Sequence, residues 1–400
     1  MKFTTIQDLS LKGKKALIRV DFNVPLNENG QITDDSRIQQ SLTTIKFVLN
    51  QGGTVILMSH LGRPNGTRIE ELSLAPIAKR LSETNFLNMP VTLAPDCIGE
   101  QTEKLVSRLG SGQVLLLENL RFHPGEEDPT NHSDFVDKLA KLNVDVYIND
   151  AFATAHRKHA STYYIAEKIP NHSAGFLIEK EVLILTNLLT QAKSPFYAII
   201  GGSKISTKIG LLKALCEKVD GLFIGGGMAF TFLKAMGIEI GNSLVDESHI
   251  DTAKQLLKKR GKDLDIQLPL DIVITKSLSK NAETKTINFT DGIPQGYLGA
   301  DIGPNTLKYW QELLSKAKTI FWNGPVGVFE LEPFKNGTQE IAQMIADNPA
   351  MSIVGGGDSA AAIHQMGISQ KFTCLSTGGG ATLEFIEFGT LPALEVLKKN

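Results

Sequence analysis

Cysteine is scarce in this chain of 400 residues. The three cysteines, Cys97, Cys216 and Cys374, are far apart and odd in number, so the sequence indicates neither a disulfide framework nor a Cys-x-x-Cys metal or redox site. Long hydrophobic runs are missing too, because no stretch reaches roughly 18 charge-free apolar residues and the N-terminal residues lack the apolar core of a signal peptide. We therefore expect a cytoplasmic protein without a membrane partner.

An excess of charge of one sign is also missing. Lysine and arginine number 41 against 43 acidic residues, which is too balanced for a nucleic-acid-binding surface. Arginine is nevertheless unevenly placed, since eight of the nine arginines precede residue 170 and all three Gly-Gly-Gly triplets follow residue 220. Arginine holds oxyanions through paired hydrogen bonds, and glycine lets backbone N–H groups approach a phosphate. One half is thus suited to a small anion and the other to a nucleotide.

Short apolar runs alternate with amphipathic windows along the whole chain, which predicts an α/β protein with parallel sheets, and the length favours two domains. We expect strands at 15–20, 54–58, 114–117, 145–148, 197–200, 221–224, 270–275, 319–322, 352–354 and 373–376. Helices are expected at 36–50, 100–109, 206–218, 248–260 and 305–318. The apolar segment 179–191 is predicted to be an interdomain helix, with a surface helix of either domain as the alternative.

Polar motifs follow the expected strands of the first half, and ligands bind at the carboxyl ends of strands in sheets of this type. The first strand leads into Arg-Val-Asp-Phe-Asn-Val-Pro at 19–25. Asp21 and Asn23 could contact a ligand hydroxyl there or simply form a turn. His60 and His156 could add hydrogen bonds, whereas their spacing does not fit a zinc ligand set.

Arginines follow the other three strands of this half. Arg63, Arg121 and Arg157 come shortly after them, and Arg37 lies at the start of the first helix. A single arginine is most often a surface charge. Several at corresponding strand ends predict a rim of arginines that binds a small ligand carrying phosphate and carboxylate.

The second half repeats a strand, a glycine turn and a helix start. In the segment 201–208, Lys204 and Lys208 are four residues apart, so we expect them to share a helix face at a helix N-terminus and to neutralise a polyphosphate. A structural glycine turn is the alternative. The segment is neither a Walker loop nor a dinucleotide-binding Gly-x-Gly-x-x-Gly fingerprint.

A second glycine turn is expected at 355–359. Asp358 would ordinarily cap a helix, but beside a nucleotide it could hold Mg²⁺. Asn323 and Glu330 lie in a turn-rich loop after another strand, and Glu330 would suit ribose hydroxyls.

Together these motifs closely resemble the phosphoglycerate kinase family over nearly the whole chain and in the same order. The motifs that carry the resemblance are 19–25, 59–64, 118–123, 155–157, 201–208, 322–330, 355–359 and 376–380. The resemblance implies two doubly wound parallel-sheet (Rossmann-like) domains that face a cleft and are joined by an interdomain helix. The domains would be a phosphoglycerate-binding domain at 1–170, with a C-terminal return segment at 389–400, and a nucleotide-binding domain at 171–388 that includes the helix at about 179–191.

The resemblance also implies site residues. Those for 3-phosphoglycerate or 1,3-bisphosphoglycerate would be Asp21, Phe22, Asn23, Arg37, His60, Leu61, Gly62, Arg63, Arg121 and Arg157. Those for ATP or ADP would be Lys208, Asn323, Glu330, Gly356, Gly357, Asp358 and Ser359, with Asp358 nearest to Mg²⁺. Arg37 and Lys204 would flank the phosphoryl group during direct in-line transfer, which would require hinge closure of a monomeric glycolytic enzyme.

Two departures from the family pattern accompany this resemblance. Ser203 and Thr207 stand where many members carry Ala and Asp, and Phe388-Gly389 replaces Gly-Lys. The competing interpretations are a nicotinamide-dependent oxidoreductase, whose glycine fingerprint is missing, and a non-catalytic anion-binding protein.

Overall fold

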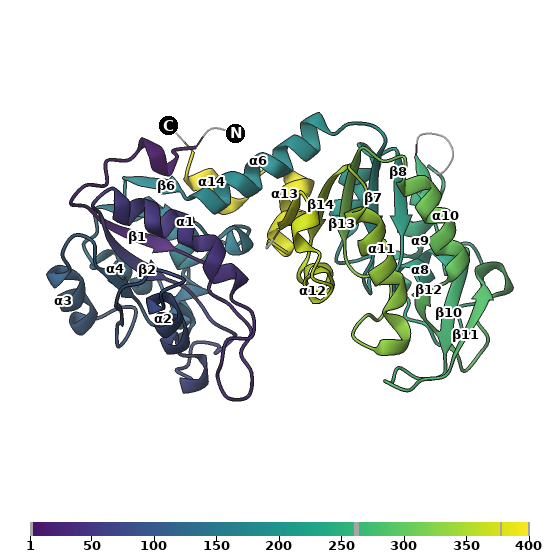
Figure 1. Ribbon diagram of the computed structural model, residues 1–400, viewed down its shortest axis with the longest axis horizontal. Helices are drawn as coiled ribbons and strands as arrows, with labels where there is room; N and C mark the ends of the chain where they lie inside the picture. The colour runs from purple at the N-terminus through teal and green to yellow at the C-terminus, as the bar shows by residue number, and fades with distance from the viewer. Residues whose placement is uncertain (1–2, 260–263, 377, 399–400) are drawn as a thin grey trace. The chain divides into compact units, whose positions relative to one another are not determined.

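The computed structural model describes residues 3–259, 264–376 and 378–398, and the chain divides into two compact units. Unit 1 comprises Met1–Leu183 and Thr390–Asn400, and unit 2 comprises Ile184–Gly389. Figure 1 labels their helices and strands. No helix in the described ranges is both long and apolar enough to cross a membrane.

Unit 1 is built on a six-stranded parallel sheet in the order β3-β4-β2-β1-β5-β6. Its strands are β1 (Lys15–Arg19), β2 (Thr54–Met58), β3 (Val91–Leu93), β4 (Val114–Leu116), β5 (Val146–Asn149) and β6 (His172–Ala174). Every residue of β2, β4 and β5 is buried, as expected for parallel strands covered on both faces.

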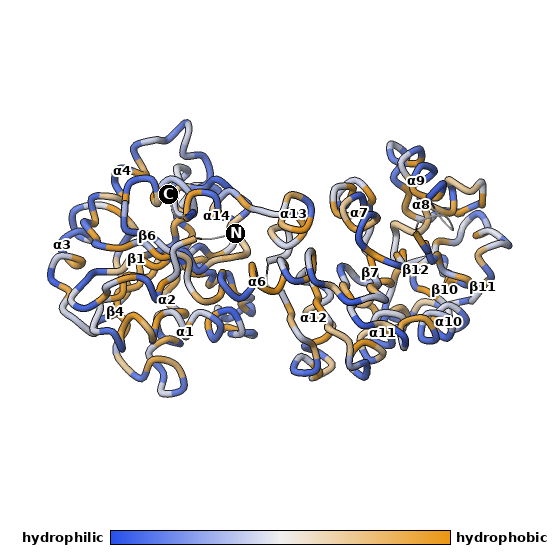
Figure 2. The backbone as a smooth tube through the Cα atoms, turned by 90° about the horizontal axis from the view of Figure 1, so that it is seen from above, coloured by the Kyte–Doolittle hydropathy of each residue, from blue (hydrophilic) through white to orange (hydrophobic). Residues whose placement is uncertain are grey.

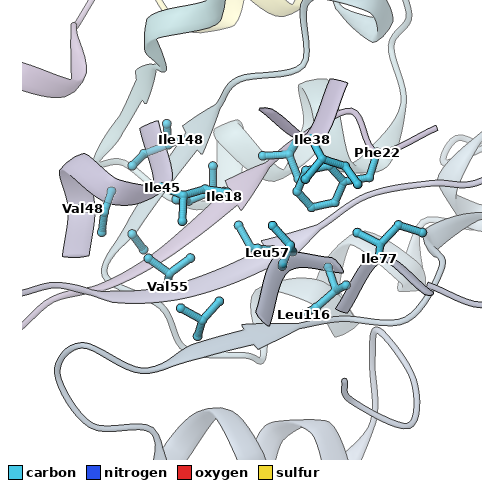
Figure 3. Packing of buried hydrophobic residues seen from close by; sticks show 14 of the residues in the cluster. Ile18, Phe22, Ile38, Ile45, Val48, Val55, Leu57, Ile77, Leu116 and Ile148 are labelled. Carbon is cyan, nitrogen blue, oxygen red and sulfur yellow. The ribbon is translucent and has the colours of Figure 1, made fainter. Parts of the chain in front are cut away.

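Helices cover this sheet. They are α1 (Ser36–Asn50), α2 (Ala75–Ser82), α3 (Glu100–Arg108), α4 (Asp134–Ala140), α5 (Ile165–Lys168) and α14 (Pro392–Val396). The apolar face of α1 packs Ile38, Ile45 and Val48 into a core that also holds Ile18 and Phe22 (Figure 3). The tube in Figure 2 shows α3 as largely hydrophilic, which fits its few buried residues.

Unit 2 contains a second six-stranded parallel sheet in the order β15-β14-β13-β7-β8-β9. Its strands are β7 (Phe196–Ile200), β8 (Gly221–Ile224), β9 (Asp265–Gln267), β13 (Thr319–Asn323), β14 (Met351–Gly355) and β15 (Cys374–Ser376). The helices are α7 (Ile209–Cys216), α8 (Met228–Ala235), α9 (Ile250–Leu257), α10 (Pro304–Leu314), α11 (Asn336–Ala346), α12 (Gly357–Gln365) and α13 (Gly380–Phe388). Trp310 and Trp322 are fully buried in its core.

A separate antiparallel sheet in unit 2 differs from the sequence prediction. The strand expected at 270–275 exists as β10 (Asp271–Thr275), but it lies between β11 (Thr284–Asn288) and β12 (Leu298–Ile302) and not in the parallel sheet. The residues of β11 are mostly exposed and polar, so no hydrophobic run marked that strand in the sequence.

The first unit extends beyond the expected boundary at residue 170. Strand β6 pairs with β5, which places residues 172–174 in the sheet of unit 1. Helix α6 (Phe176–Gln191) starts three residues before the expected 179, where the Asp150 carboxylate accepts a hydrogen bond from Leu177 N at 2.8 Å. Because Ile184 opens unit 2, α6 begins in unit 1 and ends in unit 2 (Figure 1).

Candidate active site

The carboxyl ends of β1, β2, β4 and β5 lie at one edge of the parallel sheet of unit 1, and the loops that follow them carry the predicted anion-binding residues. Asp21 follows β1 and is 5% exposed. Its carboxylate pairs with Arg37 Nη1 at the start of α1, and its Oδ1 lies 3.9 Å from His60 Nδ1. The structure therefore brings these three predicted residues together.

Arg19 belongs to the same group, although sequence reasoning did not select it as a site residue. It is fully buried at the end of β1, and its Nη2 lies 3.1 Å from His60 Nδ1. A guanidinium group only donates hydrogen bonds, so His60 Nδ1 accepts and the imidazole proton lies on Nε2. Burial, together with the charge of Arg19, holds the pKa of His60 well below 6.5, so His60 is neutral at pH 7.

A buried carboxylate balances the Arg19 charge. Arg19 Nε donates to Ser161 Oγ at 2.8 Å, and Ser161 Oγ donates to Glu126 Oε1 at 2.6 Å. Burial raises the pKa of Glu126, and the positive charge of Arg19 offsets only part of this rise. The one sequence signal for the contacts of Arg19 was its position as a charged residue at the end of an otherwise apolar strand. A charge that is buried in this way requires a partner.

The loop after β2 is tied to two neighbouring loops through Gly62. Gly62 N donates to Asn23 Oδ1 at 2.9 Å, and Arg121 Nη1 donates to Gly62 O at 2.8 Å. Gly62 has a φ of +64°, and a Cβ atom there would approach Leu72 Cδ2 to 2.8 Å. The positive φ favours glycine at this position, because L side chains rarely adopt it.

The remaining predicted arginines differ in their surroundings. Glu127 Oε1 lies 2.9 Å from Arg121 Nη2 and 3.8 Å from Arg157 Nη1, so one carboxylate links both arginines. Arg63 is exposed and forms no ion pair or hydrogen bond within the described ranges. Its charge is thus available to a ligand.

The side chains of three other predicted residues do not face a ligand freely, because two are packed in the core and one is paired with an arginine. Phe22 and Leu61 pack into the core of unit 1, so any ligand contact by them would go through the backbone. His156 accepts from Arg157 Nε at 3.2 Å, and burial together with Arg157 lowers the pKa of His156 to about 4.

In unit 2, a pocket of about 440 Å³ lies against the glycine turns that follow β7 and β8 and the loop after β13. These three segments approach one another closely. A Cβ atom on Gly201 would lie 2.1 Å from Pro325 O, and one on Gly226 would lie 2.8 Å from Gly202 N. Only glycine permits this contact of bare backbones, which leaves room for a ligand in front of them.

Lys208 is folded back onto these turns. Its Nζ donates to Gly201 O at 2.5 Å and to Asn323 O at 3.2 Å. Burial lowers the pKa of Lys208 to about 8, and the charge of Asp358 opposes this shift. The ammonium group is therefore still mostly protonated at pH 7 but loses its proton at a lower pH than an ordinary lysine does.

The prediction that Lys204 and Lys208 share a helix face is wrong. Helix α7 begins at Ile209, and the residues before it form turns in which the Asp246 carboxylate accepts a hydrogen bond from Ser206 N at 2.9 Å. The N–H group of Ser206 is thus bound by a side chain from a distant segment, and α7 begins only three residues later. Lys204 is exposed, and its ammonium group has no partner in the described part of the chain.

The turn between β14 and α12 brings together the other predicted nucleotide residues. Gly356 has a φ of +103°, and Ser359 Oγ accepts a hydrogen bond from Gly324 N at 2.9 Å. Asn323 Nδ2 donates to Gly355 O at 2.7 Å, while the buried Asn323 Oδ1 has no partner among the described residues. Asn323 therefore holds the turn after β14 through its amide group, while its Oδ1 is buried and unpaired among the described residues.

Two carboxylates border the pocket without forming an ion pair in the described ranges. Asp358 is the second residue of α12, and Glu330 lies in the loop after β13; both side chains are exposed. In proteins, magnesium is commonly held by one or two carboxylates together with phosphate oxygens and waters. Asp358 therefore fits the predicted metal role.

The apolar wall of the pocket was missed by sequence reasoning. It includes Phe230, Leu244, Leu278, Leu298 and Val326. Leu244 and Leu278 are 61% and 47% exposed, which suits the cover of a flat apolar ligand group. Only Phe230 lies in α8 and Leu298 in β12, whereas Leu244, Leu278 and Val326 lie in loops, so the sequence gives no periodic pattern that would group them.

Comparisons with known proteins agree with this arrangement. The family model described as phosphoglycerate kinase matches residues 6–388. A phosphoglycerate kinase of Dictyoglomus turgidum is 51% identical over 397 residues, covering 98% of both chains. The solved structure of phosphoglycerate kinase from Coxiella burnetii has a TM-score of 0.85 at 40% identity and covers 99% of this chain and 98% of its own. The structure from Pyrococcus horikoshii has a TM-score of 0.84 at 32% identity, with 98% of both chains covered.

Proposed function

Because the chain belongs to the phosphoglycerate kinase family, we propose that unit 1 binds 3-phosphoglycerate or 1,3-bisphosphoglycerate and that unit 2 binds ADP or ATP with Mg²⁺. The protein is a phosphotransferase with a carboxyl group as acceptor, and it transfers phosphate reversibly between 1,3-bisphosphoglycerate and ADP in glycolysis. Family membership supports neither a nicotinamide-dependent oxidoreductase nor a non-catalytic anion-binding protein. The observation that carries the assignment of unit 1 is the Asp21 carboxylate between Arg37 and His60.

The rim of unit 1 suits a small hydroxy acid that carries a phosphate. Asp21 and Asn23 would contact the hydroxyl group, and Arg63, Arg121 and Arg157 would hold the anionic groups. Neutral His60 would add its Nε2–H as a donor without adding charge. Gly62 would shape the loop, and Phe22 and Leu61 would contribute backbone groups and core packing.

The pocket of unit 2 suits a nucleotide. Its apolar wall would hold the base, Glu330 the ribose, and Lys208 the phosphates together with the N–H groups at the start of α12, from Gly356 to Ser359. Asn323 would support this turn through its hydrogen bond to Gly355 O. Asp358 would hold Mg²⁺, which when bound neutralises phosphate charge.

The chain's own residues would act in the transfer by positioning and by charge. We propose direct in-line transfer in which Arg37 and Lys204 stabilise the charge that spreads over the phosphoryl oxygens. The two half-sites belong to separate compact units, which supports a hinge-bending closure around α6 that excludes water. We further propose a cytoplasmic monomer.

A coupled assay with ATP, Mg²⁺ and 3-phosphoglycerate tests the proposal directly. We expect ADP formation that depends on 3-phosphoglycerate. ATP consumption that does not depend on 3-phosphoglycerate, or no consumption at all by folded protein, would contradict the proposed function.

Replacing Arg63 with alanine is expected to raise KM for 3-phosphoglycerate roughly tenfold with little change in kcat, because a free rim charge mainly supplies ground-state binding. Steady-state kinetics with varied 3-phosphoglycerate measure this effect. The matched control is Arg108→Ala, which also removes an exposed arginine, here at the end of α3 and outside the predicted site. An unchanged KM in Arg63→Ala would place Arg63 outside the site.

The buried ammonium group of Lys208 predicts a pH dependence. Its folded pKa of about 8 lies below the ordinary value of 10.5, so the phosphate-binding cation is present below pH 8 and is lost as pH rises through 8. kcat/KM for MgADP should then fall by about tenfold per pH unit at higher pH. Lys208→Arg should lack this inflection because arginine stays protonated. A wild-type profile that stays flat up to pH 9.5 would refute the role of Lys208.

A further inference from the structure

Three side chains of different chemistry meet in the loops that follow β3 and β4 of unit 1, and none of the three belongs to the arginine rim described above. Asp96 and Cys97 follow β3, and His123 lies between the short helices Leu120–Phe122 and Pro124–Glu126 that follow β4. One ligand atom of each, a carboxylate oxygen, the thiol sulfur and an imidazole nitrogen, lies within 4.8 Å of the other two. We propose that Asp96, Cys97 and His123 form a binding site for a zinc-type divalent cation.

The three atoms need little movement to surround an ion. His123 Nε2 and Asp96 Oδ1 are already 2.7 Å apart. Tetrahedral zinc with bonds near 2.3 Å to sulfur and near 2.0 Å to nitrogen keeps its ligand atoms roughly 3.5 Å apart. Binding therefore requires His123 Nε2 and Asp96 Oδ1 to move apart by about 1 Å, while the sulfur starts within 4.8 Å of both atoms.

The backbone around the site is well anchored. Asp96 Oδ1 accepts a hydrogen bond from Cys97 N at 2.6 Å, and Asp96 O accepts one from Thr102 Oγ1 at 2.9 Å. The His123 ring stacks on Phe135 with a centroid distance of 5.3 Å. Ligands on such fixed positions lose little entropy when an ion binds.

An ion has an entry path from one side. The side chains of Asp96 and His123 are 40% and 27% exposed, whereas Cys97 is fully buried behind them. The site thus resembles an open three-ligand zinc site, with water in the fourth position. Sulfur and imidazole ligands favour zinc or cobalt over magnesium, which separates this site from the proposed magnesium role of Asp358.

The charges nearby are compatible with a cation. Arg68 donates to Pro95 O, but its guanidinium group is also 2.8 Å from Glu70 Oε1 and 3.6 Å from Glu118 Oε2, so two carboxylates offset its charge. Burial, with the charges of Asp96 and Glu126, raises the pKa of the Cys97 thiol well above 9. Burial and the nearby carboxylates thus disfavour the thiolate, and a bound divalent cation would favour it instead.

Proton movements follow from these contacts. The Cys97 thiol would release one proton to solvent when its sulfur binds the ion. In the neutral imidazole of His123, the proton that Nε2 now donates to Asp96 would move to Nδ1, and Nε2 would bind the ion. No oxidant or reductant is required.

Cobalt(II) provides a direct test because a cobalt–thiolate bond produces a charge-transfer absorption band. We expect reduced wild-type protein to show this band on addition of about one equivalent of Co²⁺, and Zn²⁺ but not excess Mg²⁺ to abolish it. Absence of the band from folded protein would overturn the proposal.

Variants identify the ligands. Cys97→Ser should lose the band, and His123→Asn and Asp96→Asn should each weaken Co²⁺ binding by at least about tenfold. Circular dichroism checks that each variant is folded. If Cys97→Ser does not fold, Asp96→Asn still tests the site, because the Asp96 side chain is partly exposed and its replacement should not disturb folding. Cys216→Ser and His132→Asn, which alter another buried cysteine and an exposed histidine, should retain wild-type binding. A band that persists in Cys97→Ser, or vanishes in Cys216→Ser, would refute the assignment.

Discussion

Lys204→Ala is expected to lower kcat by about two orders of magnitude or more, the scale of losing a charge contact made in the transition state. Lys204 lies in the turns between β7 and α7, and its exposed ammonium group has no partner in the described ranges. Its removal should therefore leave folding intact. Turnover measured in both reaction directions, with thermal unfolding alongside, separates the two properties.

The matched control for this variant is Lys218→Ala, which removes an exposed lysine just after α7. We expect wild-type kcat and unchanged unfolding from it. Near-normal turnover by Lys204→Ala would contradict the transition-state role. A decrease that appears only in KM for the nucleotide would reassign Lys204 to ground-state phosphate binding.

Arg37→Ala is expected to reduce both turnover and stability. kcat should fall by about two orders of magnitude, because Arg37 is the second proposed charge on the transferred group. The free energy of unfolding should fall by about 1–3 kcal/mol, because the buried Asp21 carboxylate loses its ion-pair partner. Steady-state kinetics and urea unfolding measure the two effects independently.

A double-mutant cycle with Asp21→Asn distinguishes catalysis from structure. Neutralising Asp21 removes the unpaired charge, so the double variant Asp21→Asn/Arg37→Ala should regain most of the lost stability while kcat stays low relative to Asp21→Asn alone. If kcat recovers together with stability, Arg37 acts only by holding Asp21. Arg108→Ala, on the exposed surface of α3, controls for the loss of an arginine and should change neither property.

The parallel α/β architecture was predictable from the sequence because buried parallel strands are short, nearly continuous apolar runs. The strands at 54–58 and 319–322 and the helix at 36–50 appear with almost the expected bounds. Polar, exposed β11 carries no such signal. A strand can therefore be predicted from the sequence when its side chains are buried and apolar, and it escapes prediction when they are exposed and polar.

Side-chain partners were less predictable than strand ends. Asp21, Arg37 and His60 were each predicted to lie at the ligand-binding edge of the sheet, because each follows a strand or begins a helix there. The contact of Arg19 with His60 depends on which buried groups face each other across that edge. Lys208 Nζ donates to the carbonyl groups of Gly201, just after β7, and of Asn323, at the end of β13, and the sequence gives no sign that these distant segments meet.

The sequence by itself determined that one half of the chain places arginines at strand ends and the other places glycine turns there. Both patterns are local, because a strand, its exit and the next helix lie within about 30 residues. The tertiary structure decided the strand order β3-β4-β2-β1-β5-β6 of unit 1 and the contact that places the proton of His60 on Nε2. It also decided, separately, the apolar wall of the pocket in unit 2 and the meeting of Cys97 with His123. Such contacts join segments distant in the sequence, and only the packing of strands and helices against one another sets which of them meet.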